Sequence, residues 1–146
     1  MWDPLGSVAA KAGKAKVIFD LATDPVFAGK YCCFLYASDI VLEKNPEEIA
    51  ALLRAYEKAQ DWIAKNPEEA VQIIIDGKYS EIEDKDLAVE LIKSYEYPTV
   101  EERAKGTEDV GGNVKYFATQ LHNIGYLTTD PDAFTQKAYE KVDLTK

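Results

Sequence analysis

Two short β-type runs, followed by helical periodicity to the end of the chain, most limit what this sequence can fold into. Residues 16–20 (Lys-Val-Ile-Phe-Asp) and 31–36 (Tyr-Cys-Cys-Phe-Leu-Tyr) are rich in β-branched and aromatic side chains and predict strands. The second run is apolar on both faces, as in a buried strand with neighbours on either side. Because a two-stranded sheet is only marginally stable alone, the sequence predicts a sheet from which strands are missing.

Helix-start and helix-stop residues divide most of the remaining chain. Asp3-Pro4 begins a first helix, and Gly13 ends it in a left-handed conformation. From Ser38 onward the apolar period is 3.6, which predicts about six more helices. Helices are predicted to begin at Ser38 or Asp39, Asn45-Pro46, Asn66-Pro67 and Asp130-Pro131. Helices are predicted to end near Lys44, at Gly77, before Pro98 and at Gly125.

Composition and charge exclude several classes of partner and site. The 146 residues hold 17 Lys and Arg against 26 Asp and Glu, a net charge of −9, which argues against nucleic acid and anionic membrane surfaces. No apolar run approaches the roughly 20 residues of a membrane span, and the N-terminus lacks the features of a secretory signal. With two cysteines and one histidine, we predict no metal site, no cofactor and no disulfide framework.

An ordered set of segments carries a resemblance to a known family. The segments are Trp2-Asp3-Pro4-Leu5, Asp24-Pro25-Val26-Phe27 before the run from Tyr31 to Ser38, Asn45-Pro46-Glu47 opening a helix with Trp62, and the tail pieces 121–127 and 134–139. Together they resemble the C-terminal half of the periplasmic solute-binding proteins of ABC importers. The group is the nitrate/sulfonate/bicarbonate/taurine (NMT1/THI5-like) family, which also contains binders of thiamine precursors.

The resemblance implies a fold, a location and a function. The fold is α/β and helix-rich, a partial type II periplasmic-binding-protein fold with few strands. Residues 1–146 form one domain, in which 1–30 correspond to the end of the second lobe and the crossover, and 31–146 to the C-terminal part of the first lobe. The chain then corresponds to a truncated or split coding sequence. Its full-length relatives are periplasmic or membrane-associated outside the cell, whereas a chain without a signal sequence leaves a cytoplasmic location open.

The implied function is capture of a small solute for an ABC permease, without catalysis. The residues that match the ligand cleft of the family are Trp2, Asp3, Tyr31, Phe34 and Tyr36. In the predicted strand Phe34 and Tyr36 share one face and Tyr31 lies on the other, and either face could line a cleft. In the alternative, purely structural interpretation, Asp3 caps a helix and Trp2 is an aromatic side chain that packs beside it. Because half of the pocket is not encoded, we expect binding by this chain alone to be impaired.

Two other functions stay open. One is a helical interaction module unrelated to transport, against which a sheet of the two predicted strands would argue. The other is a fragment of a pyrimidine-synthase-type enzyme, in which a cysteine cluster holds iron. Here only Cys32 and Cys33 occur, without candidates for further ligands, and we predict both to be buried and slow to react.

Four further expectations concern the surface. Exposed backbone groups on the predicted strands favour pairing with a second copy, so we expect a homodimer. Gly111-Gly112-Asn113 is predicted to be a turn and helix N-cap, although its N–H groups could meet an anion. His122 is expected at the surface near a helix end, and the acidic pairs at 47–48 and 68–69 are expected in first helical turns.

Overall fold

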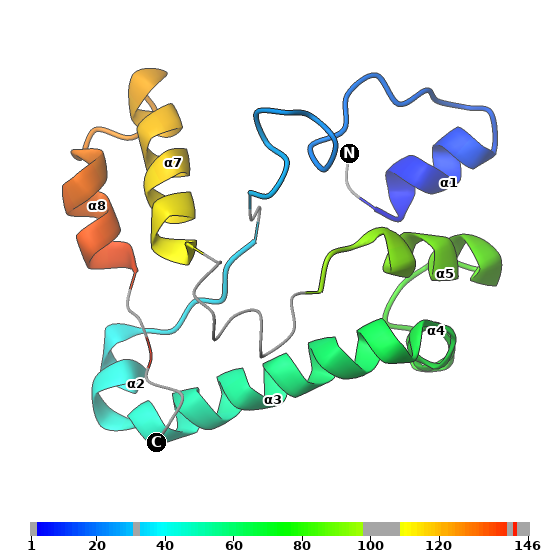
Figure 1. Cartoon of the computed structure of the whole chain (residues 1–146), viewed down its shortest axis with the longest axis horizontal. Coiled ribbons are helices and arrows are strands. Elements are labelled where there is room, and N and C mark those ends of the chain that lie inside the picture. The colour runs from blue at the N-terminus through cyan, green and yellow to red at the C-terminus, as the bar shows by residue number, and fades with distance from the viewer. Residues whose placement is uncertain (1–2, 31–32, 98–108, 140–141, 143–146) are drawn as a thin grey trace. The chain divides into compact units, whose positions relative to one another are not determined.

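The computed structural model describes residues 3–30, 33–97, 109–139 and 142 (Figure 1). Within these ranges every regular element is an α-helix. The helices are α1 (Leu5–Lys11), α2 (Asp39–Lys44), α3 (Pro46–Lys65), α4 (Pro67–Asp76), α5 (Lys85–Ser94), α7 (Val110–Asn123) and α8 (Pro131–Ala138). None of the described helices is long and apolar enough to cross a membrane. The helix-rich character predicted from the sequence is confirmed.

The predicted helix ends are confirmed at most positions. The Ser38 side chain accepts a hydrogen bond from the backbone N–H of Val41 and caps α2. Both acidic pairs lie in first turns, those of α3 and α4, where negative charge stabilises the helix dipole. Gly13 and Gly125 follow α1 and α7 with φ of 68° and 76°, a left-handed conformation that costs glycine little. These boundaries follow from local chemistry alone.

Helix α4 ends at Asp76 with Gly77 as its C-cap residue, as predicted, but the left-handed conformation falls one residue later. Gly77 has a right-handed φ of −78°, whereas Lys78 has a φ of 53°. The N–H of Lys78 donates to the carbonyl of Ile75 (3.1 Å), and the N–H of Tyr79 donates to that of Ile74 (3.0 Å). A lysine therefore occupies the left-handed position that helix caps usually give to glycine.

Replacing Lys78 by glycine is expected to stabilise the chain. A side chain in the left-handed region costs about 1–2 kcal/mol, which glycine avoids. The greater entropy of glycine in the unfolded chain offsets about half of this benefit, so we expect a net gain of up to about 1 kcal/mol. Urea denaturation followed by circular dichroism measures it. Lys78→Ala keeps the β-carbon and serves as the control, which should not show this gain. A lower urea midpoint for Lys78→Gly would contradict the assignment.

The two predicted strands are not formed in the part of the chain that the structure describes. Residues 16–20 and 33–36 have irregular backbone, and the side chains of Val17, Ile18 and Leu35 are exposed. A strand requires a neighbour to satisfy its N–H and C=O groups, and no described segment supplies one. The strands of the predicted α/β class are therefore not observed among the described residues, where the predicted strand sequences have no partner.

Backbone contacts divide the chain into two compact units. Unit 1 comprises Met1–Ala28 and Tyr56–Val100, and unit 2 comprises Gly29–Ala55 and Glu101–Lys146. Helix α3 contributes residues to both units. Each unit is described below by itself.

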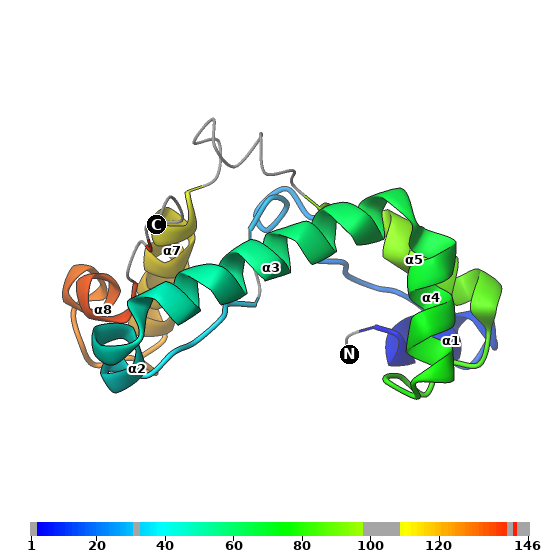
Figure 2. The same ribbon diagram turned by 90° about the horizontal axis from the view of Figure 1, so that it is seen from below.

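Unit 1 is built around the pair α4 and α5, which lie side by side in Figure 2. Its core is the buried cluster of Val71, Ile82, Leu87 and Ala88, against which apolar side chains of both helices pack. Exposed ion pairs join the helices at their surface: Lys93 with Glu68 (2.6 Å), and Lys11 of α1 with Asp84 before α5 (2.6 Å). The small core makes each of these buried side chains important for stability.

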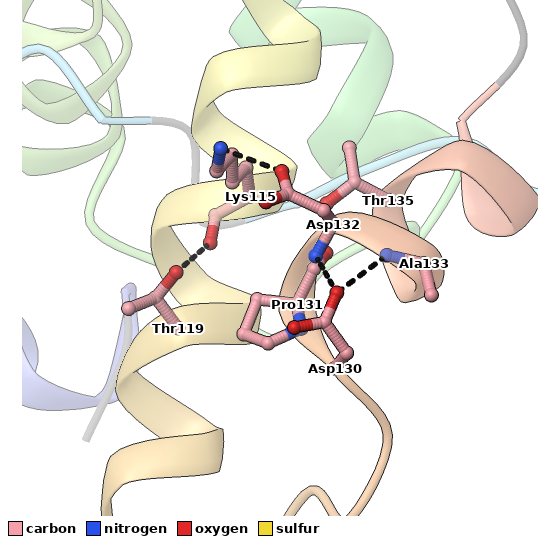
Figure 3. A network of polar contacts seen from close by, with 7 residues as sticks. All are labelled: Lys115, Thr119, Asp130, Pro131, Asp132, Ala133 and Thr135. Atoms are coloured by element: carbon pink, nitrogen blue, oxygen red, sulfur yellow. Dashed lines mark hydrogen bonds and ion pairs between the residues drawn. The ribbon is translucent and has the colours of Figure 1, made fainter.

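Unit 2 contains the packed pair α7 and α8. Ala118 and Asn113 of α7 are buried, and the Asn113 amide donates to the carbonyl of Asp109 (2.9 Å). Lys115 of α7 forms an ion pair with Asp132 of α8 (2.5 Å), as Figure 3 shows. Because both side chains are largely exposed, this ion pair contributes little to the stability of the helix pair.

Candidate functional site

A pocket of about 180 Å³ lies in unit 1. It is lined by Ile63, Ala64, Pro67, Ile92, Lys93, Tyr95 and Tyr97. The end of α3 and the start of α4 supply apolar walls, because α3 ends at Lys65 and α4 begins at Pro67. Helix α5 and the residues after it supply the polar groups, an ammonium and two phenols. Apolar walls with a few polar groups are typical of small-molecule sites.

Asp3, predicted as a ligand-binding residue, lies beside this pocket. The hydroxyl of Tyr95 donates to Asp3 Oδ2 (3.3 Å), and the hydroxyl of Ser7 donates to Oδ1 (2.5 Å). Both carboxylate oxygens are therefore oriented by neutral donors. The N-cap residue of α1 is Pro4, and no side chain caps this helix, so the interpretation of Asp3 as a helix cap is wrong.

The two tyrosines of the pocket remain protonated well above neutral pH. Burial, with the nearby charge of Asp3 as the next cause, raises the pKa of Tyr95 to about 12. Burial also raises the pKa of Tyr97, with a smaller contribution from Tyr56. The rings of Tyr95 and Tyr97 meet edge to face, with centroids 6.4 Å apart. The pocket thus presents neutral hydroxyl groups on fixed aromatic walls.

Lys93 is paired with Glu68 at the edge of the pocket. Its ammonium lies 2.6 Å from Glu68 Oε1, and the hydrogen bond from Lys93 lowers the pKa of that carboxyl group. Both side chains are exposed, so a ligand can compete for either charge. An anionic group could bind Lys93, while an amine or hydroxyl group could donate to Asp3.

Tyrosine ionisation tests this environment. Titration of tyrosinate absorbance should show one of the last ionisation steps near pH 12, and Tyr95→Phe should remove it. Because the folded pKa lies above the unfolded value of about 10, the neutral phenol stabilises the fold at all lower pH values. That contribution declines as pH rises from about 10 towards 12. Tyr79→Phe, which removes an exposed tyrosine, is the control variant. If the ionisation step near pH 12 persists in Tyr95→Phe, the assignment is contradicted.

Comparison with known proteins addresses the segment that follows Asp3. A family model described as NMT1/THI5 like matches residues 5–70. This NMT1/THI5-like segment spans α1, α2, α3 and the start of α4, and it confirms the resemblance over that range. No curated protein and no solved structure matches the chain significantly.

The NMT1/THI5-like segment contains three of the remaining predicted site residues, Tyr31, Phe34 and Tyr36. Phe34 is half-buried and Tyr36 is 88% exposed, and both lie in unit 2. Tyr31 and, before the segment, Trp2 lie outside the described residues. Of the three predicted residues that the structure describes, Asp3 is the one that lies against the pocket.

Tyr95 and Tyr97 were not predicted as site residues. The sequence predicted a helix that ends before Pro98, but α5 ends at Ser94 and Tyr95 has extended backbone. The signal that could have found them is the alternating Tyr-Glu-Tyr at 95–97, directly before the stop at Pro98. Such alternation places both rings on one side of an extended chain.

Three other expectations have definite outcomes. The thiol of Cys33 is exposed, so the prediction of burial is wrong at this position, whereas Cys32 lies outside the described residues. His122 is exposed, with Nδ1 3.0 Å from the carbonyl of Leu127, as predicted. Gly111 and Gly112 lie in the first turn of α7, whose N-cap is Asp109, so the prediction of a turn there is wrong. No cluster suited to a metal ion occurs within 3–30, 33–97, 109–139 and 142.

Proposed function

We propose that this chain is part of the solute-binding component of an ABC importer. The observation that carries the proposal is the match of residues 5–70 to the NMT1/THI5-like family. The solute belongs to the nitrate, sulfonate, taurine or thiamine-precursor type, the permease is its partner, and the complete protein has the type II periplasmic-binding fold and a location outside the cytoplasm. The chain captures its solute without changing it chemically.

The pocket beside Asp3 is the proposed part of the solute site that this chain supplies. A cavity of about 150 Å³ can hold a benzene ring, so a volume of about 180 Å³ suits a small solute. Asp3 and Lys93 offer an acceptor and a cation, and the Tyr95 hydroxyl, whose proton is donated to Asp3, offers a further acceptor. Solutes with both a donor group and an anionic group fit this set.

Binding to the chain alone is expected to be weak. Tight sites bury about 70–90% of a small ligand, whereas Tyr95 at this pocket is 46% exposed. Losing about 4 kcal/mol of contacts moves a micromolar site to roughly millimolar, because each 1.4 kcal/mol is tenfold. We therefore expect dissociation constants in the millimolar range.

Amide chemical shifts of the ¹⁵N-labelled chain provide the test. Titration with taurine, methanesulfonate, nitrate and an aminopyrimidine should give saturable shifts in α1 and around Tyr95 for at least one solute. Asp3→Asn should weaken that binding, whereas Asp39→Asn on α2 is the matched control. Saturation below about 10 µM would overturn the expectation of weak binding, and no shifts at about 50 mM of every solute would overturn the function itself.

A pyrimidine-synthase-type enzyme fragment is the second candidate. The description of the matched model covers THI5-like proteins, and the exposed thiol of Cys33 is accessible to chemistry. A lysine adduct of pyridoxal phosphate, trapped by borohydride, or stoichiometric iron in the purified chain would favour this candidate. A helical interaction module lacks comparable support, although the sheet that would argue against it is not formed in the described residues.

A second copy of the chain is the other proposed partner. Several apolar side chains before α3 are exposed in each unit, among them Ile18, Leu21 and Val26 in unit 1 and Leu35 and Ile40 in unit 2. Apolar surface of this kind favours association, and a two-fold dimer is the commonest closed arrangement. Light scattering after size exclusion should give a mass near twice 16.3 kDa.

A further inference from the structure

The segment 16–20 combines apolar exposure with unused backbone groups. It follows α1 as irregular chain, drawn in blue in Figure 1. The exposed fractions are 71% for Val17, 96% for Ile18 and 55% for Phe19. No backbone group of residues 15–19 hydrogen bonds to another described residue. A β-branched and aromatic run in this state is a template for strand pairing.

The charges at its two ends select one arrangement of such a pair. Lys16 precedes the apolar centre and Asp20 follows it. In an antiparallel pair of two copies centred on Ile18, Lys16 of each copy lies opposite Asp20 of the other. A parallel pair in register would instead oppose like charges at both positions, which is destabilising. A slip by one residue would turn every side chain to the other face.

The surroundings of Asp20 are compatible with this role. Asp20 Oδ1 accepts a hydrogen bond from the N–H of Ala22 (2.9 Å), which holds the carboxylate where the segment turns. The carbonyl of Asp20 accepts from the N–H of Asp24 (3.0 Å), so the run ends in an ordered turn. Lys16 forms no ion pair with a described residue, and both charges are available to a second copy.

We propose that segment 16–20 is a dimerisation strand, which pairs antiparallel with the same segment of a second copy about a two-fold axis at Ile18. The proposal rests on the homodimer proposed above and names its contact. A two-stranded ribbon alone is marginal, so further apolar contact is needed. Leu21 and Val26 are more than half exposed next to the segment, and Phe27 packs edge to face on Phe19 with centroids 5.9 Å apart. These side chains supply that contact.

Charge reversal tests the register. Lys16→Glu or Asp20→Lys places like charges opposite each other twice in a two-fold pair. Each variant should raise the dimer dissociation constant by about tenfold or more, and the double reversal should restore it. Sedimentation equilibrium measures the constant, and Lys14→Glu, outside the paired residues, controls for net charge. If the variant with both Lys16→Glu and Asp20→Lys dimerises no more tightly than either single variant, the proposed register is wrong.

The two proposals fail in different ways. A wild-type chain that remains a sharp monomer at millimolar concentration overturns the homodimer and the strand together. A wild-type dimer whose dissociation constant ignores all three variants overturns the strand and leaves the homodimer standing.

A disulfide provides an independent test that does not depend on charge. In the proposed pair Ile18 lies opposite itself, with Cα atoms about 4.5–5.5 Å apart, which is within disulfide range. In a background with Cys32→Ser and Cys33→Ser, Ile18→Cys should cross-link rapidly on mild oxidation. Val17→Cys is the matched control, because its symmetry mate lies diagonally, at about 7–8 Å. Equal cross-linking rates for the two variants would overturn the pairing.

Discussion

Leu87→Ala is expected to lower the free energy of unfolding of unit 1 by about 2–5 kcal/mol. Leu87 is 7% exposed and belongs to the buried cluster with Val71, Ile82 and Ala88. Removing its side chain takes away apolar burial and leaves a cavity that the small core can fill only in part. The backbone N–H of Leu87 donates to Asp84 Oδ1 (2.9 Å), and alanine preserves this cap of α5. The loss therefore reports packing alone.

Urea denaturation followed by far-ultraviolet circular dichroism measures this loss. Leu52→Ala on α3 is the matched control, because the same atoms are removed from a side chain that is 60% exposed. We expect the control to change stability by no more than about 0.5 kcal/mol. Equal losses for both variants would contradict the placement of the core between α4 and α5.

The helix boundaries could be predicted because they depend on a few adjacent residues. Ser38 before α2 and Asp130 before α8 accept hydrogen bonds from N–H groups two or three residues later. The residues after α4 show the limit of this reasoning. Gly77 is the obvious stop in the sequence, but the left-handed position falls on Lys78, and no local pattern distinguishes the two.

The strands could not be predicted in the same way, since they depend on residues elsewhere. The run at 16–20 has the composition of a strand, yet a strand forms only where a neighbour accepts its backbone hydrogen bonds. The exposure of Ile18 and the irregular backbone show that no described segment does so. The sequence pattern thus records a preference that this chain alone does not satisfy.

The candidate site likewise has one part that the sequence could predict and one that it could not. Asp3 was predicted because the residues around it resemble a ligand-binding segment of a known family. Its partner Tyr95 is 92 positions further along the chain, and nothing in either local sequence joins them. The same holds for the pocket, whose walls come from α3, α4 and α5. Contacts of this kind follow from tertiary packing, which local patterns in a single sequence do not determine.

Asp130→Ala is expected to destabilise α8 and its packing on α7 by about 0.5–2 kcal/mol. Figure 3 shows Asp130 Oδ1 accepting hydrogen bonds from the N–H groups of Asp132 and Ala133, each at 3.0 Å. Helix α8 has eight residues, which is too short for stability by itself in water. Loss of the cap leaves two N–H groups without an internal acceptor, so the helix should fray from Pro131.

Amide hydrogen exchange within α8 measures this fraying. The expected loss corresponds to roughly a 2- to 30-fold decrease in protection, since each 1.4 kcal/mol is tenfold. Asp130→Asn keeps a side-chain oxygen that can accept the same hydrogen bonds and should retain most of the protection. The ion pair of Lys115 with Asp132 does not replace the cap, because it engages side chains and leaves the N–H groups unsatisfied. Equal protection in the alanine and asparagine variants would show that packing against α7, and not Asp130, holds the first turn of α8.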